Sequence, residues 1–367
     1  MRRGENIFKR KDGRWEGRYI CGRREDGRAK YHSIYAHSYT ECSQKLCFAK
    51  MNRLPNSTST PLTVEELFNI WLLSRKNTVK QSTYATYKTI YENYVHKSLG
   101  SYRISLVNPY LLNRYVDDLI NTDRSRGKPL SAATVQSVII LLRSVFAYGE
   151  DEYCIMNPVK KLSIPKCDVH ETNVFYQNEI KRIKSAADIH NSYDLGVLLC
   201  LYTGLRIGEL CALKYGSIDT KNELLRIRYT LSRICNPSGD PKTIVIIDTP
   251  KSQKSVRDIP LPQFLNDQIS IMKNRHSEDD YFLTGGSKYT EPRCYQYHYQ
   301  KLLKRAGVPY RKFHSLRHTF ATSCIKMGID VKTVSELLGH SSIKITLERY
   351  MHSDMDTKRE QLAGLYE

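Results

Sequence analysis

The sequence predicts an α+β protein of several domains: a small basic three-stranded β-sheet with a helix, a helical bundle, and a mainly α domain with a β-hairpin insert. Three observations lead to this prediction. The 367 residues exceed the roughly 100 to 200 residues of one typical domain. The first 54 residues alternate short strand-like runs with turns, whereas residues 62–158 repeat apolar residues at helical spacing. Helical patterns continue from residue 173, interrupted by strand-like runs between residues 222 and 261.

The first region, residues 1–54, is predicted to form three antiparallel strands followed by one helix. Two Asp-Gly dipeptides, at residues 12–13 and 26–27, are strong signals for tight hairpin turns. The run over residues 38–54 then spaces its apolar side chains for one helical face.

Residues 1–53 carry 14 Lys or Arg and 6 Asp or Glu. Four large aromatic residues are interleaved with this positive charge: Trp15, Tyr19, Tyr31 and Tyr35. Because a β-sheet can enter a DNA groove, the region is interpreted as a DNA-binding sheet. The alternative is a basic subdomain that holds protein.

The second region, residues 62–158, is predicted to be a bundle of about four helices. Each helical run follows a residue suited to cap a helix N-terminus: Thr63, Ser82, Asn108 and Ser131. A linker of Pro, Ser and Thr over residues 55–61 precedes the bundle. Residues 159–172 are basic and interrupted by proline, and are interpreted as a second linker lying near a DNA backbone.

Charge and cysteine content narrow the class of protein. The 57 Lys and Arg against 38 Asp and Glu give a net charge of +19, which favours nucleic acid as partner over a membrane surface. The ten cysteines form no metal-binding spacing, and several stand in apolar runs, so a reducing cytoplasmic location is expected. The N-terminus lacks a signal peptide pattern, and a transmembrane helix is not expected.

The third region, residues 173–367, contains several short motifs that carry chemistry. T-G-L-R-I-G-E-L places Arg206 at the start of a helix, and a strand turn holds Lys251. H-S-L-R-H-T-F-A-T places His314 and Arg317 at i and i+3, hence on one helical face. L-G-H ends a helix at Gly339 before a further helix with Tyr350.

Together these motifs resemble the tyrosine recombinase, or phage integrase, family. The match requires six residues of the right types in order over about 145 positions. It implies the following catalytic set: Arg206, Lys251, His314, Arg317, His340 and Tyr350. It also implies that residues 1–54 are an arm-type DNA-binding domain, residues 62–158 a core-binding domain and residues 173–367 the catalytic domain, as in integrases of lambda-type phages and conjugative transposons.

The resemblance implies site-specific recombination through a 3′-phosphotyrosine intermediate. Tyr350 is then the nucleophile, two arginines stabilise the phosphate, and Lys251 is the general acid, with Lys254 the less favoured candidate. His314 assists proton removal and His340 hydrogen-bonds the scissile phosphate. No metal or other cofactor is required. The implied partners are double-stranded DNA at attachment sites, a homo-tetramer on that DNA, and an excisionase or a host DNA-bending protein as accessory factor.

Two rival functions remain at this point: a type IB topoisomerase and a non-catalytic DNA-binding protein of the same fold. Structural roles are expected for Glu209, His318 and His352. Residues 357–367 place Leu362, Leu365 and Tyr366 on one helical face. They are expected to dock on the next catalytic domain of a tetramer, or alternatively on their own.

Overall fold

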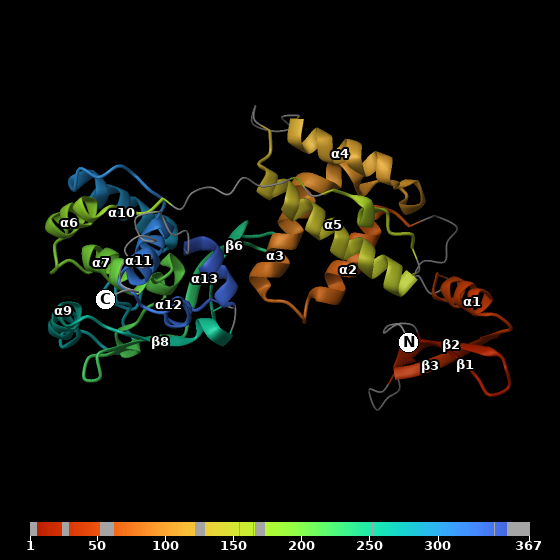
Figure 1. Ribbon diagram of the computed structural model, residues 1–367, viewed down its shortest axis with the longest axis horizontal. Coiled ribbons are helices and arrows are strands. Elements are labelled where there is room, and N and C mark those ends of the chain that lie inside the picture. Colours follow the sequence, from red (N-terminus) through yellow and green to blue (C-terminus); the bar gives the residue numbers. More distant parts are fainter. Residues whose placement is uncertain are drawn as a thin grey trace, which may run out of the picture. The chain divides into compact units, whose positions relative to one another are not determined.

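The computed structural model describes residues 6–23, 29–51, 62–121, 129–153, 155–163, 165, 173–250, 253–340 and 342–350. The chain forms two compact units, Met1–Asp168 with Cys235–Gly239, and Val169–Ile234 with Asp240–Glu367. The fold is α+β, with three small sheets among many helices (Figure 1).

The N-terminal part of the chain is an antiparallel sheet with one helix, as predicted. The strands are β1 (Ile7–Lys9), β2 (Trp15–Arg23) and β3 (Ala29–Ala36), in the order β1-β2-β3. Helix α1 (Tyr39–Met51) packs against the sheet, where Cys42 and Leu46 are buried against Gly17 (Figure 1). The second predicted Asp-Gly turn lies outside the described residues.

The four aromatic residues divide between the two faces of this sheet. Trp15 contacts Tyr39 of α1, with ring centroids 5.2 Å apart. Tyr35 pairs with Glu16 across the strands and therefore lies on the opposite, open face, because cross-strand partners share a face. Tyr31 is on the open face too, 56% exposed. Only part of the predicted aromatic set therefore faces outward.

The described residues of the helical part form four α-helices and three other helical segments. They are α2 (Val64–Arg75), α3 (Gln81–Ile90), the π-helical continuation η1 (Tyr91–Gly100), η2 (Ile104–Leu106), α4 (Pro109–Asn121), α5 (Ala132–Tyr153) and η3 (Pro158–Lys161). Their shared core includes Trp71 of α2, 1% exposed, and Phe68 stacked on Tyr91 at 3.7 Å between centroids.

Three of the four predicted N-caps are confirmed. Thr63 accepts a hydrogen bond from the Glu66 amide, and Asn108 and Ser131 accept from amides three residues on. The prediction for Ser82 was wrong, because α3 begins earlier and Lys80 is its extended N-cap residue.

The helical part continues past residue 158. The basic stretch predicted as a linker does not begin at residue 159, since Val159 and Leu162 are buried in the core of the helices.

Helix α5 alone among the described helices is long and apolar enough to span a membrane by length and composition. Its apolar residues form the core of the helical part, which accounts for that composition.

The C-terminal part is mainly helical, with strands between residues 218 and 260. Its helices are α6 (Gln177–Ala186), α7 (Ser192–Thr203), α8 (Ile207–Cys211), η4 (Tyr215–Ser217), η5 (Gln253–Ser255), α9 (Gln263–Lys273), α10 (Pro292–Arg305), α11 (His314–Lys326), α12 (Val331–Leu338) and α13 (Ile343–Tyr350). Helix α7 is apolar nearly all round and lies in the core, where Leu195, Val197 and Leu199 are fully buried.

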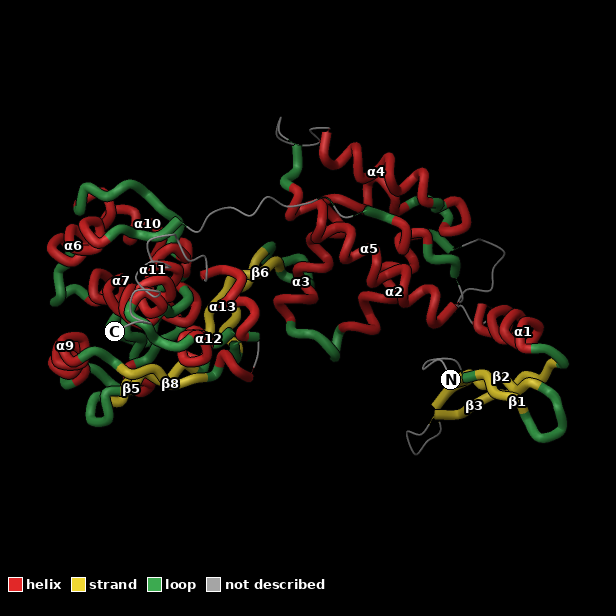
Figure 2. The backbone as a smooth tube through the Cα atoms, in the orientation of Figure 1, coloured by secondary structure: helices red, strands yellow, loops and turns green. Residues whose placement is uncertain are grey.

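The strands of this part form two small sheets. They are β4 (Ile218–Asp219), β5 (Leu224–Ile227), β6 (Thr230–Cys235), β7 (Thr243–Asp248) and β8 (Arg257–Pro260). Strands β6 and β7 pair with each other. Strand β5, which precedes them in the chain, pairs antiparallel with β8, which follows them (Figure 2). The predicted strands are confirmed, and β4 is an additional two-residue strand.

Candidate active site

Arg206 stands at the junction of α7 and α8. Gly204 ends α7 with a left-handed φ of 66°, where an added Cβ would lie 2.6 Å from the Phe320 ring. Arg206 is the extended N-cap residue of α8, and its side chain is 35% exposed. Leu205 and Leu210, on either side of it in the chain, are buried. The local fold thus fixes the backbone of Arg206 while leaving its guanidinium accessible.

Glu209 holds Arg206 from within the first turn of α8. Its carboxylate accepts from the Arg206 amide at 3.0 Å and from Nη1 of the same residue at 2.8 Å. Burial acts to raise the pKa of Glu209, but the charges and hydrogen bonds of Arg257 and Arg206 outweigh it and leave that pKa below its ordinary value. The structural role predicted for Glu209 agrees with this geometry.

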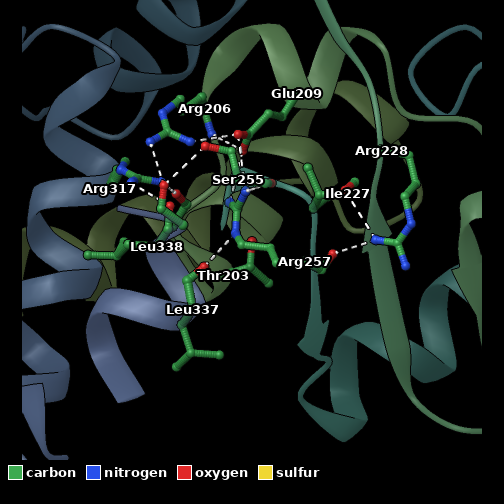
Figure 3. A network of polar contacts seen from close by, with 12 residues as sticks. Thr203, Arg206, Glu209, Ile227, Arg228, Ser255, Arg257, Arg317, Leu337 and Leu338 are labelled. Carbon is green, nitrogen blue, oxygen red and sulfur yellow. Dashed lines mark hydrogen bonds and ion pairs between the residues drawn. The ribbon is translucent and has the colours of Figure 1, made fainter. Parts of the chain in front are cut away.

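Arg317 is a buried cation on α11, 1% exposed. Its Nη1 donates to the Gly204 carbonyl at 2.8 Å and its Nη2 to the Leu338 carbonyl at 2.6 Å (Figure 3). Both acceptors lie at helix C-termini, where carbonyls lack helical partners and the helix dipole favours a positive charge. These contacts satisfy a charge that would otherwise be costly to bury.

His314 was predicted to share a face of α11 with Arg317. It is exposed, whereas Arg317 is buried. The His314 ring meets the ring of His318 edge to face, with centroids 4.5 Å apart. His314 and Arg317 are three positions apart in the helix, but the buried guanidinium of Arg317 points toward α7 and α12. His314 therefore remains at the accessible start of α11.

His340 follows the turn that ends α12. Gly339 has a left-handed φ of 63°, and a Cβ there would lie 3.0 Å from Ser255 Cα and 3.1 Å from the Lys254 carbonyl oxygen. His340 Nδ1 is 2.8 Å from the hydroxyl of Thr346, a fully buried residue on α13. Thr346 was not singled out from the sequence, and it fixes the orientation of the His340 ring.

Three successive carbonyls at the end of α12 accept hydrogen bonds from three different arginines (Figure 3). Leu337 accepts from Arg257 Nε at 2.6 Å, Leu338 from Arg317, and Gly339 from Arg206 Nη2 at 3.4 Å. The structure therefore brings Arg206, Arg317 and the turn before His340 to one point.

Arg257 and Ser255 belong to this cluster and were missed in the sequence. Ser255 donates its hydroxyl to the Gly339 carbonyl at 3.2 Å. Strand β8 alternates buried Arg257 and Ile259 with exposed residues, so an arginine at an inward position of a strand was the available signal.

The remaining predicted site residues are only partly described. Tyr350 is the last residue of α13, and its side chain lies outside the description, as does all of Lys251. Lys254 is exposed in η5, close to the turn at Gly339. His352 and residues 357–367 also lie outside the described part.

The arrangement suits recognition of a phosphate. Guanidinium groups match phosphate oxygens in shape and keep their charge at all ordinary pH values. The side chain of Arg206 is 35% exposed, His314 is exposed at the start of α11, and His340 is half-buried. Hydrogen bonds to Glu209 and Thr346 fix the side chains of Arg206 and His340.

Comparison of the sequence with protein families supports a shared origin. The profile described as "Phage integrase family" matches residues 173–357, and "Phage integrase, N-terminal SAM-like domain" matches residues 63–120. A "Tyrosine recombinase XerC-like" protein of Caldanaerobacter subterraneus subsp. tengcongensis is 33% identical over 362 residues, covering 90% of each chain. A "Putative prophage phiRv2 integrase" of Mycobacterium tuberculosis is 26% identical over 304 residues, covering 80% of this chain and 76% of its own.

Solved structures share the fold. The Tn1549 transposon integrase in complex with transposon right end DNA aligns with a TM-score of 0.68 at 22% identity, covering 83% of this chain and 100% of that one. A lambda integrase dimer bound to a COC' core site aligns with a TM-score of 0.56 at 15% identity, covering 95% and 96%.

Proposed function

The chain belongs to the phage integrase family of tyrosine recombinases, and from this premise we propose a site-specific recombinase that integrates and excises a mobile element. The observation that carries the proposal is the convergence of Arg206, Arg317 and the turn before His340 on the end of α12. Helix α13 follows this turn directly and ends at Tyr350.

The proposed reaction is a transesterification at phosphorus. The phenolic oxygen of Tyr350 forms a bond to the scissile phosphorus while the bond from phosphorus to the 5′-oxygen breaks. His314 accepts the phenolic proton, and Lys251 gives a proton to the departing 5′-oxygen, with Lys254 as the alternative donor. Attack of a 5′-hydroxyl from the second duplex reverses these steps and releases Tyr350, so no external energy source is consumed.

The arginines and His340 are proposed to stabilise the transition state. Negative charge accumulates on the non-bridging oxygens, and preorganised donors aimed at them lower the barrier. By comparison with other preorganised donors, losing one costs roughly 3 to 4 kcal/mol. Anchoring Arg317 on two carbonyls and Arg206 on Glu209 fixes these donors before DNA arrives.

The three regions are proposed to divide the DNA contacts. Residues 1–54 would bind arm-type sites, and residues 62–158 would bind the core site together with the catalytic residues 173–367. A lambda integrase tetramer has been solved bound to a Holliday junction, and we propose a tetramer of this chain on its own DNA. The proposed place of action is the cytoplasm, with an excisionase or a host DNA-bending protein as accessory partner.

The open face of the N-terminal sheet supports a DNA-binding role for the first region. Glu16 is 2% exposed and accepts from Arg18 Nε at 2.8 Å and from Arg10 Nη1 at 3.0 Å. Arg18 also lies over the Phe8 ring, 4.9 Å from its centroid. The sheet therefore presents arginines in fixed positions, and bidentate contact with guanine is the commonest specific use of arginine in DNA recognition.

Deleting residues 1–54 is expected to remove one class of binding site. Binding-site selection from random duplexes with the Tyr350→Phe chain should recover two unrelated motifs, and the shortened chain should recover one with unchanged affinity. Arg18→Ala should lose the same motif because Arg18 is on the open face, whereas Lys45→Ala, which removes a charge paired with Glu41 on α1, should retain it. Equal loss of both motifs on deletion would refute a separate module.

Strand exchange between two duplexes tests the proposed function. When a duplex is nicked beside the cleavage point, cleavage releases a short strand, and the covalent complex then cannot religate. Covalent complexes trapped in this way from a random library of nicked duplexes identify a sequence that the chain cleaves, here called the selected duplex. Two labelled copies of different length should give recombinants of new lengths. Covalent adduct with plasmid relaxation but no recombinant would indicate a type IB topoisomerase, and binding without adduct a non-catalytic DNA-binding protein.

A further inference from the structure

Arg257 makes four hydrogen bonds within the cluster at the end of α12. Its side chain is 5% exposed, and it donates to the Leu337 carbonyl, to the Ser255 carbonyl at 3.0 Å and to both carboxylate oxygens of Glu209 (Figure 3). The side chain of Arg206, by contrast, is 35% exposed. Arg257 therefore contacts Glu209 and the end of α12 from within the protein.

We propose that Arg257 is a positioning residue for strand cleavage, which acts by fixing the guanidinium of Arg206 through Glu209 and by holding the turn that carries His340. This inference rests on the proposed function, because it concerns the same phosphate site.

The first path from Arg257 runs through Glu209. Arg257 Nη1 and Nη2 contact Oε1 and Oε2 at 3.1 and 2.9 Å, so the fork sets the plane of the carboxylate. Oε1 in that plane also accepts from Arg206 Nη1 at 2.8 Å. Without the fork, the contacts that remain to Glu209 in this cluster come from Arg206 itself, through its backbone amide and its 35% exposed side chain, so no second residue sets the plane of the carboxylate against which the guanidinium is held.

The second path runs through the end of α12. Arg257 Nε holds the Leu337 carbonyl at 2.6 Å, and the next two carbonyls accept from Arg317 and Arg206. The turn also packs directly on β8, since a Cβ on Gly339 would lie 3.1 Å from Arg257 Cδ. A change at Arg257 thus reaches both proposed phosphate-binding arginines and the backbone before His340.

A purely structural role for the same ion pair makes different predictions. Buried ion pairs often add little net stability, while breaking one leaves an unpaired buried charge and destabilises the fold. Such a defect would reduce the amount of folded protein, but the cleavage rate of the folded fraction would depend on the charge of the scissile phosphate as it does in the unmodified chain. The charge dependence of cleavage therefore separates positioning from structure.

The test compares Arg257→Lys with a matched control, Arg226→Lys. Arg226 is on the neighbouring strand β5 and forms an exposed ion pair with Asp219, 2.6 Å away. Lysine keeps the charge in each case but cannot form the bidentate contact. Single-turnover cleavage of the selected duplex should fall about 100-fold for Arg257→Lys, the scale expected for a displaced catalytic group. DNA affinity and the cleavage rate of Arg226→Lys should be unchanged.

Two further measurements make the result specific. A duplex with a neutral methylphosphonate at the scissile position lacks the charge that Arg206 would stabilise, so most of the Arg257→Lys defect should disappear on it. Combining Arg257→Lys with Arg206→Lys should cost less than the two single losses multiplied together, because part of the Arg257→Lys defect acts through the guanidinium that Arg206→Lys has already removed.

Three results would overturn the proposal while the recombinase function stands. They are normal cleavage by Arg257→Lys, the same defect on the charged and neutral duplexes, and additive losses in the double variant. Failure of the unmodified chain to form any adduct with the selected duplex would overturn the proposed function and the inference together. Thermal unfolding of each variant gives the folded fraction, so a folding defect in Arg257→Lys is corrected for rather than mistaken for slow chemistry.

Discussion

Tyr350→Phe is expected to eliminate covalent attachment to DNA while DNA affinity stays unchanged. The substitution removes one oxygen atom, and that oxygen is the proposed nucleophile, so no other group replaces it in the bond to phosphorus. Because phenylalanine keeps the aromatic ring, no change in the fold is expected. Denaturing gel electrophoresis of the trapped complex measures the adduct, and a filter-binding assay measures affinity.

Tyr229→Phe serves as the matched control for this substitution. Tyr229 is 54% exposed between β5 and β6 and loses the same hydroxyl. It should form adduct at the unmodified rate. Adduct formed by Tyr350→Phe would show that a different residue is the nucleophile.

Arg317→Lys is expected to slow cleavage by about 100- to 1,000-fold, the range found when one preorganised donor to an oxyanion is removed. Lysine keeps the positive charge but has a single nitrogen. Its N–H donors all radiate from that one atom, so they do not match the planar fork by which Nη1 and Nη2 of Arg317 reach the Gly204 and Leu338 carbonyls. The charge is then no longer held between α7 and α12 where the phosphate is proposed to bind.

The same Arg226→Lys variant provides the control, because it makes the identical substitution at an exposed ion pair. Single-turnover rates at saturating protein separate the chemical step from DNA binding. A rate within the error of the unmodified chain would exclude Arg317 from the cleavage step. Loss of affinity in proportion to rate would instead assign it to DNA binding.

Several parts of this site followed from the sequence because the signals were local. Gly339 stands just past an apolar helical run, and it adopts the left-handed conformation that ends a helix. Arg206 was expected at the start of a helix and is the N-cap residue of α8. In each case the residues that decide the conformation lie within a few positions of it.

The features that were missed depend on contacts between distant segments. Arg257 pairs with Glu209, 48 positions earlier, and with Leu337, 80 positions later. Its inward position on β8 shows only that it is buried, and does not reveal what it contacts. The burial of Arg317 was missed for the same reason, because its acceptors belong to α7 and α12.

The failed N-cap at Ser82 has a different cause. Capping propensity favours Ser over Lys, yet the Lys80 carbonyl accepts from the amides of Thr83 and Tyr84 and α3 begins before Ser82. Packing of the helix therefore outweighed the local preference. The roles of Lys251 and the Tyr350 side chain stay predictions from the resemblance.

Identification of the amino acid that carries the DNA tests the central claim most directly. The unmodified chain is trapped on the selected duplex, digested with trypsin and nuclease, and the nucleotide-bearing peptide is sequenced by mass spectrometry. The account predicts one modified residue, Tyr350, joined to a 3′-phosphate, with a free 5′-hydroxyl on the released strand. DNA joined to any other residue, or to Tyr350 through a 5′-phosphate, would contradict it.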